Sequence, residues 1–221
     1  MSDLKALTPG TWTIDSSHSN IGFVARHLMV AKVRGNFSDF TGTITIAADP
    51  LKSTVEATVD AKSVNTGDEG RDNHVRGEDF FDVENHKQWT LVSTGIDTAG
   101  SDYVLHTNLT IKGVTQPVDF ALEFEGVISD PWGNTKAGFT AEAEINRKDF
   151  GIEFNIALEA GGVVVGDKVK ILLEIEALKS EVLSPEEASR HVNQTTEPRS
   201  AVRARCESIG GVLHRSARLH C

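Results

Sequence analysis

The sequence predicts an all-β protein whose antiparallel strands enclose one hydrophobic core. Apolar and polar residues alternate with a period of two from Trp12 to Leu178, as expected for strands with one buried and one solvated face. Turn-forming residues such as Asp49-Pro50 and Ala99-Gly100 separate most of these segments. Of the 221 residues, 39% are hydrophobic and 24% charged, which is typical of a globular protein that one barrel or sandwich can account for.

About eight strands follow one another along the chain. Several have roughly 10–14 residues and would span about 30–45 Å. Hairpin-linked strands of this kind form sandwiches or up-and-down barrels. The residues expected to face inward are, strand by strand, Ile21, Phe23, Ala25 and His27; Gly42, Ile44 and Ile46; Val55, Ala57 and Val59; Trp89 and Leu91; Tyr103, Leu105, Thr107 and Leu109; Val118, Phe120, Leu122 and Phe124; Phe139, Ala141, Ala143 and Ile145; and Val169, Ile171, Leu173 and Ile175.

Three segments depart from the alternation. Thr66-Gly67-Asp68-Glu69 matches a capping box, which predicts a short helix running towards Phe80. The stretch 147–165 is expected to be a long connection that covers one barrel end. After Lys179 the alternation stops, and we expect a short helix followed by a disordered tail. The predicted organisation is therefore an N-terminal extension (1–8), a barrel domain (9–179) and a C-terminal tail (180–221).

The predicted interior is either filled or hollow. Ten Phe residues against one Tyr suit a dry interior. A barrel of about eight strands is either just filled by its side chains or keeps room for one ligand. Small inward residues favour the hollow form, although they also accommodate neighbouring Phe rings. They are Ala25, Gly42, Ala57, Ala141 and Ala143.

Charge and cysteine usage exclude several classes of partner. A formal net charge of −10 argues against nucleic acid and disfavours docking on anionic membranes. No apolar run is long enough to span a bilayer or to form a secretory signal, so the protein is not expected to be membrane-inserted. Both cysteines, Cys206 and Cys221, lie in the tail, and a cysteine-free body predicts a cytoplasmic protein without disulfides.

The sequence contains no catalytic or metal-binding motif. The histidines of the body lack the close spacing of a zinc site on one element. The G-x-S-x-G, phosphate-loop and dinucleotide patterns are absent. A Ser-His-Asp arrangement assembled by the fold stays open. We therefore expect a protein that is not an enzyme and that has neither a cofactor nor a metal.

Four polar residues are candidates for holding a ligand's head group. His27 shares a face with Phe23, so it is either a buried histidine bonded to the backbone or a polar group at the end of a cavity. Arg71 and His74 either bind phosphate or carbonyl oxygens or form pairs on a solvated helix face. Arg147 either contributes to the same end or forms a salt bridge with Asp149 at a strand end.

Six stretches, taken in order, resemble the YceI-like family of lipocalin-like proteins. They are TWTIDSSHSNIGFVARHL (11–28), GNFSDFTGTI (35–44), NTGDEGRDNHVRGEDFFDV (65–83), NLTIKGVTQPVDF (108–120), INRKDFGI (145–152) and VGDKVKILLEIEAL (165–178). The resemblance implies an extended eight-stranded antiparallel lipocalin-like barrel with a short helix. Its pore would bind a polyisoprenoid or another long amphiphile, such as a polyprenyl pyrophosphate, a quinone or a fatty amide. The family has no established catalytic residues.

This reading predicts a ligand-binding wall and a polar end. The polar end is expected among His27, Arg71, His74 and Arg147. The expected wall residues are Ile21, Phe23, Ile44, Val59, Leu91, Leu109, Phe120, Leu122, Phe139 and Ile145.

Trp89 and Leu91 stand where the family commonly has Pro and Phe nearby. The bulk of Trp89 is expected to shorten or reshape the pore. The leading hypothesis is a protein that stores or transports a long-chain amphiphile and that could form a homodimer. The alternatives are a filled barrel acting as an interaction module, and an enzyme acting on an isoprenoid-type substrate.

Overall fold

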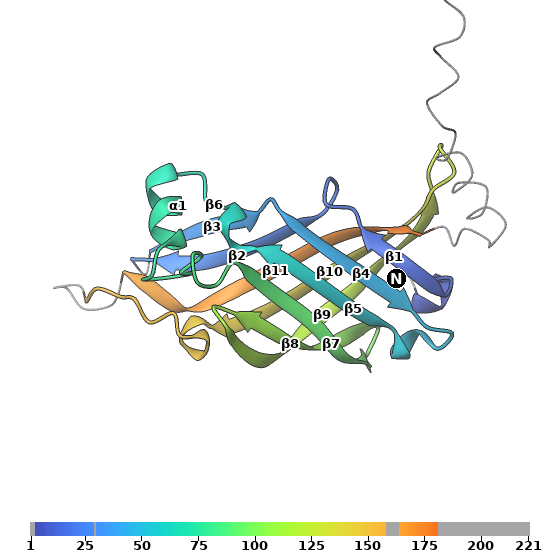
Figure 1. The fold of residues 1–221 in the computed structure, drawn as a ribbon. Coiled ribbons are helices and arrows are strands. Elements are labelled where there is room, and N and C mark those ends of the chain that lie inside the picture. The colour runs from blue at the N-terminus through green and yellow to red at the C-terminus, as the bar shows by residue number, and fades with distance from the viewer. Residues whose placement is uncertain (1–2, 29, 158–163, 181–221) are drawn as a thin grey trace, which may run out of the picture. The chain divides into compact units, whose positions relative to one another are not determined.

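The strands form one closed antiparallel barrel, shown in Figure 1. The computed structural model describes residues 3–28, 30–157 and 164–180. The strand segments are β1 (Gly10–Ile14), β2 (Asn20–His27), β3 (Ala31–Phe37), β4 (Phe40–Ile46), β5 (Thr54–Asp60), β6 (Val64–Asn65), β7 (Gln88–Ala99), β8 (Asp102–Ile111), β9 (Val114–Ser129), β10 (Thr135–Asn146) and β11 (Val165–Lys179).

These segments occupy eight strand positions in the barrel, because in three cases two segments lie end to end in the same position. β1 and β2 lie one after the other along β11, since β11 pairs with β1 near Ala177 and with β2 between Val165 and Glu174. β4 and β3 continue this arrangement because they pair with β1 and β2. β5 pairs with β4, and β6 pairs with β3. With β7 to β11 following in order, the predicted eight-stranded antiparallel barrel is confirmed. Its closure leaves no free sheet edge along the β1–β11 seam.

The strands of the second half of the barrel are long. β7, β8 and β10 have 12, 10 and 12 residues, within the expected length. β9 and β11 exceed it, with 16 and 15 residues. At about 3.3 Å per residue, β9 extends for roughly 50 Å. Strands of this length give the barrel an elongated interior.

Gly35 allows an aromatic ring to cross the sheet surface. Phe23 and Gly35 are partners in the β2–β3 pairing. A Cβ atom on Gly35 would lie 2.6 Å from Cε1 of Phe23, closer than two such carbons can approach. The absent side chain therefore creates the space that the Phe23 ring occupies.

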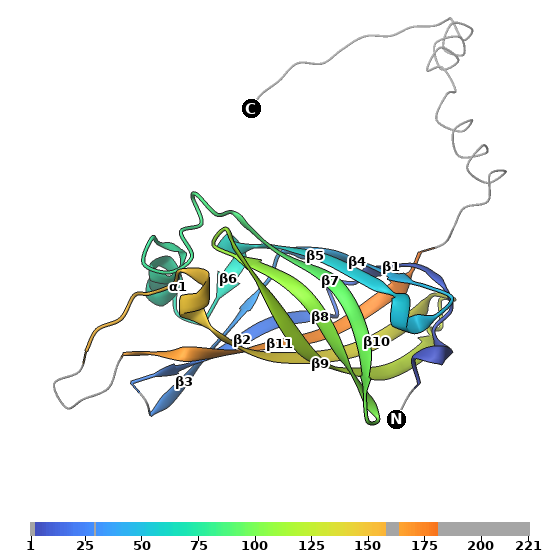
Figure 2. The same cartoon turned by 90° about the horizontal axis from the view of Figure 1, so that it is seen from below.

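The short helix predicted before Phe80 is present as α1 (Glu69–Arg76), which lies at one barrel end in Figures 1 and 2. The prediction that Thr66 caps this helix was wrong. The N-cap is Asp68, whose side-chain carboxylate accepts a hydrogen bond from the Arg71 backbone N–H at 2.8 Å. Thr66 instead donates its own N–H and hydroxyl to the Asp72 carboxylate. Within the described ranges, no helix has the length and apolar character needed to cross a membrane.

Side-chain clusters fill both ends of the barrel. At the α1 end, the buried cluster includes Phe37, Val64, Phe81 and Phe150. At the other end, residues before β1 contribute, because Leu4 and Leu7 are each only 5% exposed. The short 3-10 helix Leu4–Ala6 is held there by a bond from its first backbone N–H to the Tyr103 hydroxyl. The predicted tail from residue 181 onward, including the helix expected after Ser184, lies outside the described residues.

Candidate functional site

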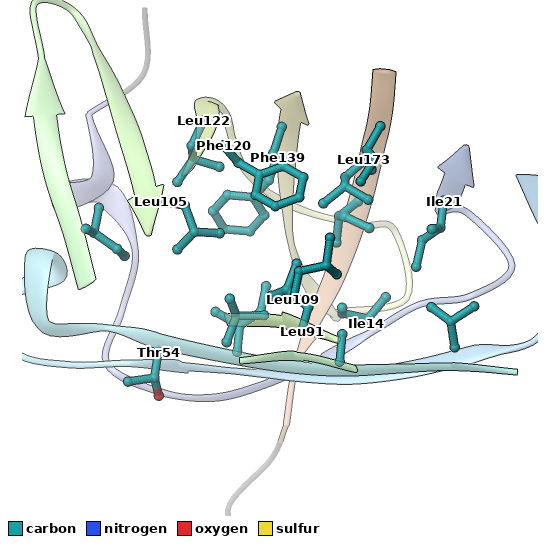
Figure 3. Close-up of a pocket in the computed structure, with 18 of the residues that line it drawn as sticks. Ile14, Ile21, Thr54, Leu91, Leu105, Leu109, Phe120, Leu122, Phe139 and Leu173 are labelled. Carbon is teal, nitrogen blue, oxygen red and sulfur yellow. The ribbon is translucent and has the colours of Figure 1, made fainter. Parts of the chain in front are cut away.

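An apolar cavity runs inside the barrel between the two end clusters (Figure 3). Its volume, measured as the space open to the centres of water-sized molecules, is about 160 Å³. One water needs about 10–15 Å³ on that measure, so the cavity is roughly ten times larger. The wall residues of β8 extend from Leu105 to Ile111, a distance of about 20 Å along the strand. The cavity is therefore long and narrow.

The inward side chains leave the centre of the barrel open. Phe23, Val59 and Leu91 lie on the cavity wall, yet each is only half-buried because it faces empty space. Two of the small inward residues, Ala57 and Ala141, also lie on the wall. Small side chains at these positions leave room that larger ones would fill.

Gly42 has a packing role outside the cavity wall. A Cβ atom there would lie 2.5 Å from Cδ1 of Ile14 and 3.2 Å from Cβ of Ala57. The absence of a side chain lets β4 pack closely against its neighbours.

The predicted wall residues gather in one place. Nine of the ten line the cavity, namely Ile21, Phe23, Ile44, Val59, Leu91, Leu109, Phe120, Leu122 and Phe139. Ile145 packs instead against the cluster at the α1 end. Their contact with a ligand stays a prediction.

Sequence reasoning missed Leu4, Leu7 and Phe37 as wall residues. Leu4 and Leu7 were assigned to an extension outside the domain. Their spacing of three within a short apolar stretch was the one available signal that a helical turn buries them.

Arg147, which directly follows β10, is a buried residue, and each of its three guanidinium nitrogens donates a hydrogen bond. It is 3% exposed, and its guanidinium donates to the backbone carbonyls of Ile152 at 2.6 Å and Gly166 at 3.1 Å. Its ion pair is with Asp167 at 3.3 Å, and not with Asp149 as the sequence suggested. Burial lowers the pKa of Arg147, although Asp167 opposes that effect. Arg147 joins the start of β11 to the chain that follows β10.

The remaining polar candidates also lie off the cavity wall. Arg71 donates to the hydroxyl and carbonyl of Thr66, and His74 bonds to Asp79 at 3.0 Å. His27 is half-buried at the end of β2, where it is paired in register with Val165. None of the four candidates lines the cavity, and His27 and Arg147 both lie beside Val165.

The cavity wall carries no charged side chain among the described residues. The polar residues that line it are Ser53, Thr54, Trp89 and Thr90. The Ser53 hydroxyl accepts a bond from the backbone N–H of Ala47 at 3.1 Å. Burying a charge without a partner is strongly unfavourable, so this interior suits an uncharged, mainly apolar molecule.

Asp15, Ser17 and His18 meet in the break between β1 and β2, but their geometry is not that of a catalytic triad. Ser17 and Asp15 both lie against the same ring nitrogen of His18, Nδ1, at 3.0 and 2.8 Å. A triad needs the hydroxyl on one ring nitrogen, which takes its proton, and the carboxylate on the other, which fixes the tautomer and stabilises the imidazolium. Hydrogen bonds from Ser17 and His18 lower the pKa of Asp15 to about 2.

The same break offers three possible metal ligands. Atoms of Asp15, His18 and Glu176 lie within 4.8 Å of one another. The Lys136 ammonium group donates to the Glu176 carboxylate at 2.7 Å, and this positive charge opposes a bound cation. Contacts from His18 to Asp15 and Glu176, and from Lys136 to Glu176, tie the break to β10 and β11.

Comparison with known proteins relates this chain to proteins of several bacteria. The YceI-like domain family matches residues 12–177. A UPF0312 protein of Staphylococcus aureus (strain MSSA476) is 38% identical over 176 residues, covering 77% of this chain and 98% of that protein. A UPF0312 protein of Pectobacterium carotovorum is 36% identical, covering 75% of this chain and 83% of that protein.

Solved structures share the fold. A YCEI protein of Campylobacter jejuni aligns with a TM-score of 0.59 and 26% identity, covering 71% of this chain and 90% of that one. BcnA of Burkholderia cenocepacia aligns with a TM-score of 0.63 and 24% identity, covering 74% and 98%. A polyisoprenoid binding domain from Saccharophagus degradans aligns with a TM-score of 0.58 and 17% identity, covering 78% and 100%.

Proposed function

The chain belongs to the YceI-like family, and we propose that it binds a long-chain amphiphile inside the barrel, for storage or transport. The observation that carries this proposal is the long cavity, whose wall has no charged side chain among the described residues. Each CH2 group that leaves water contributes about 0.8 kcal/mol. A polyisoprenoid or quinone-like chain therefore gains affinity along the whole length of the cavity without needing many polar contacts.

A binding role is favoured over the two alternatives. A filled barrel would leave no cavity, whereas this interior holds about 160 Å³ of open space. An enzyme would need reactive groups near the bound chain. The Ser17–His18 pair instead lies in the break between two strands, and neither residue lines the cavity. The polyisoprenoid binding domain with 17% identity supports the proposal at the level of the fold alone.

The proposal also covers the location of the protein in the cell and its partners. The cysteine-free body supports a reducing, cytoplasmic location, and the charge of −10 argues against nucleic-acid partners. Homodimerisation remains a prediction, which size-exclusion chromatography with light scattering would test.

Native mass spectrometry of freshly purified protein, followed by organic extraction, tests the proposed function. We expect a co-purifying amphiphile of defined mass, or uptake of a polyprenyl compound when one is offered to the stripped protein. A protein that remains ligand-free under both conditions would refute the proposal.

The variant Ala141→Trp tests whether the ligand occupies this cavity, because Ala141 lies on the cavity wall and is 5% exposed. The added indole occupies space that ligand carbons would fill. Displacing about four CH2 groups at about 0.8 kcal/mol each would weaken binding roughly 200-fold. Glu142→Trp places the same ring on the outer face of β10 and should leave binding unchanged. Equal binding by both variants would place the site elsewhere.

A further inference from the structure

One buried polar atom, on a residue that lines the cavity, has no hydrogen-bond partner. It is the indole Nε1 of Trp89 on β7, and among the described residues no other buried side-chain nitrogen or oxygen is left unpaired. The indole N–H of Trp12 shows the ordinary situation, since it donates to the Thr8 carbonyl at 3.2 Å. An indole N–H can only donate. Trp89 therefore lacks an acceptor, and a buried donor without one is destabilising.

The surroundings of Trp89 provide aromatic rings and no acceptor. Its ring packs edge-on against Phe37 and Phe81, with centroid distances of 4.9 and 4.5 Å. Phe37 also lines the cavity, whereas Phe81 belongs to the cluster that fills the α1 end. The neighbouring Thr90 points to the opposite face of the strand by the alternation of β7. Trp89 therefore lies where the cavity meets the closed end of the barrel.

We propose that the Trp89 N–H donates a hydrogen bond to an uncharged oxygen of the bound molecule, such as a carbonyl, ether or hydroxyl oxygen. This inference rests on the proposed function and specifies the ligand further. The oxygen-bearing end lies at the α1 end, and the apolar chain runs towards Leu4 and Leu7. A phosphate group is disfavoured at this position because the cavity wall, as described, offers no cation to neutralise it.

Paired ligands test the role of the N–H group. The probes are geranylgeranylacetone, a polyprenyl methyl ketone, and the hydrocarbon in which a methylene group replaces its carbonyl. One hydrogen bond to a neutral acceptor contributes about fivefold in affinity. We expect the protein to prefer the ketone by that factor and the Trp89→Phe variant to bind the ketone and the hydrocarbon with equal affinity. Trp132→Phe, at a position that is 83% exposed, should retain the preference.

The indole signals provide a second measurement that does not depend on affinity. The chain has three Trp residues, so its ¹H–¹⁵N spectrum should contain three indole signals, and Trp89→Phe identifies the relevant one. The ketone should move that signal downfield, and the hydrocarbon should not. A ketone preference that survives Trp89→Phe, or an indole signal that responds equally to both probes, would overturn the inference while leaving the proposed function intact. Binding of neither probe would count against the proposed function itself.

Discussion

Replacing the buried Arg147 with Met tests whether this residue is a structural anchor or a ligand contact. Met retains much of the side-chain volume but removes every donor. In the native protein the guanidinium donates to three backbone carbonyls, those of Ile152 at 2.6 Å, Gly166 at 3.1 Å and Val165 at 3.4 Å. The substitution leaves these carbonyls without that partner in the tight junction between β10 and β11.

The expected loss of stability follows from these bonds. Each contributes about 1 kcal/mol net, so Arg147→Met should lower the free energy of unfolding by about 3 kcal/mol. Part of this loss is offset because Met carries no charge. Burial disfavours the charged guanidinium, as the lowered pKa of Arg147 shows, and the substitution removes this unfavourable contribution. For a domain of this size, 1 kcal/mol corresponds to about 2–4 °C in Tm, so the expected decrease is about 6–12 °C.

Urea unfolding followed by tryptophan fluorescence measures the effect, and Lys148→Met is the control. The Lys148 side chain is 46% exposed and pairs with the 42% exposed Asp167 at the surface, so loss of this pair should cost less than about 1 kcal/mol. Ligand affinity measured well below the Tm should be unchanged in Arg147→Met, because its donors are engaged within the protein. A variant as stable as the native protein, or one that folds normally but loses ligand, would refute the anchor role.

Two further predictions concern pH. The carboxyl group of Asp15 has a pKa lowered from 3.8 to about 2, so its stabilising effect is complete above pH 4 and is lost as the pH falls towards 2. Asp15→Asn should therefore flatten the acid limb of a stability-against-pH curve measured by denaturant unfolding, and an unchanged limb would contradict the assignment. The imidazole of His106 contacts Asp119 at 2.7 Å and Asp97 at 3.1 Å, and these carboxylates raise its pKa above 6.5. Its stabilising effect is complete below pH 6.5 and declines as the pH rises through the folded-state pKa. An NMR titration should show the raised pKa, and Asp119→Asn should lower it. A His106 signal that titrates identically in both proteins would exclude this pairing.

The residues of the cavity wall were largely predictable because strand alternation is a local property. In β9, the side chains of Phe120 and Leu122 are two residues apart, so the pattern alone assigns both to the inner face. Side chains whose role depends on distant partners were not predictable in this way. The engagement of Arg147 depends on β11 returning to the end of β10, and no local pattern identifies the carbonyls it meets.

The barrel, its antiparallel strands and the direction of most inward side chains were determined by the sequence, because a period of two assigns each residue to one face. Tertiary structure decided how interrupted segments such as β1 and β2 share one strand position along β11. It also decided that the interior is hollow, since open volume depends on how far side chains reach towards one another across the barrel. The unpaired N–H of Trp89 has the same origin, because a missing partner is a property of the surroundings of a residue and not of its type.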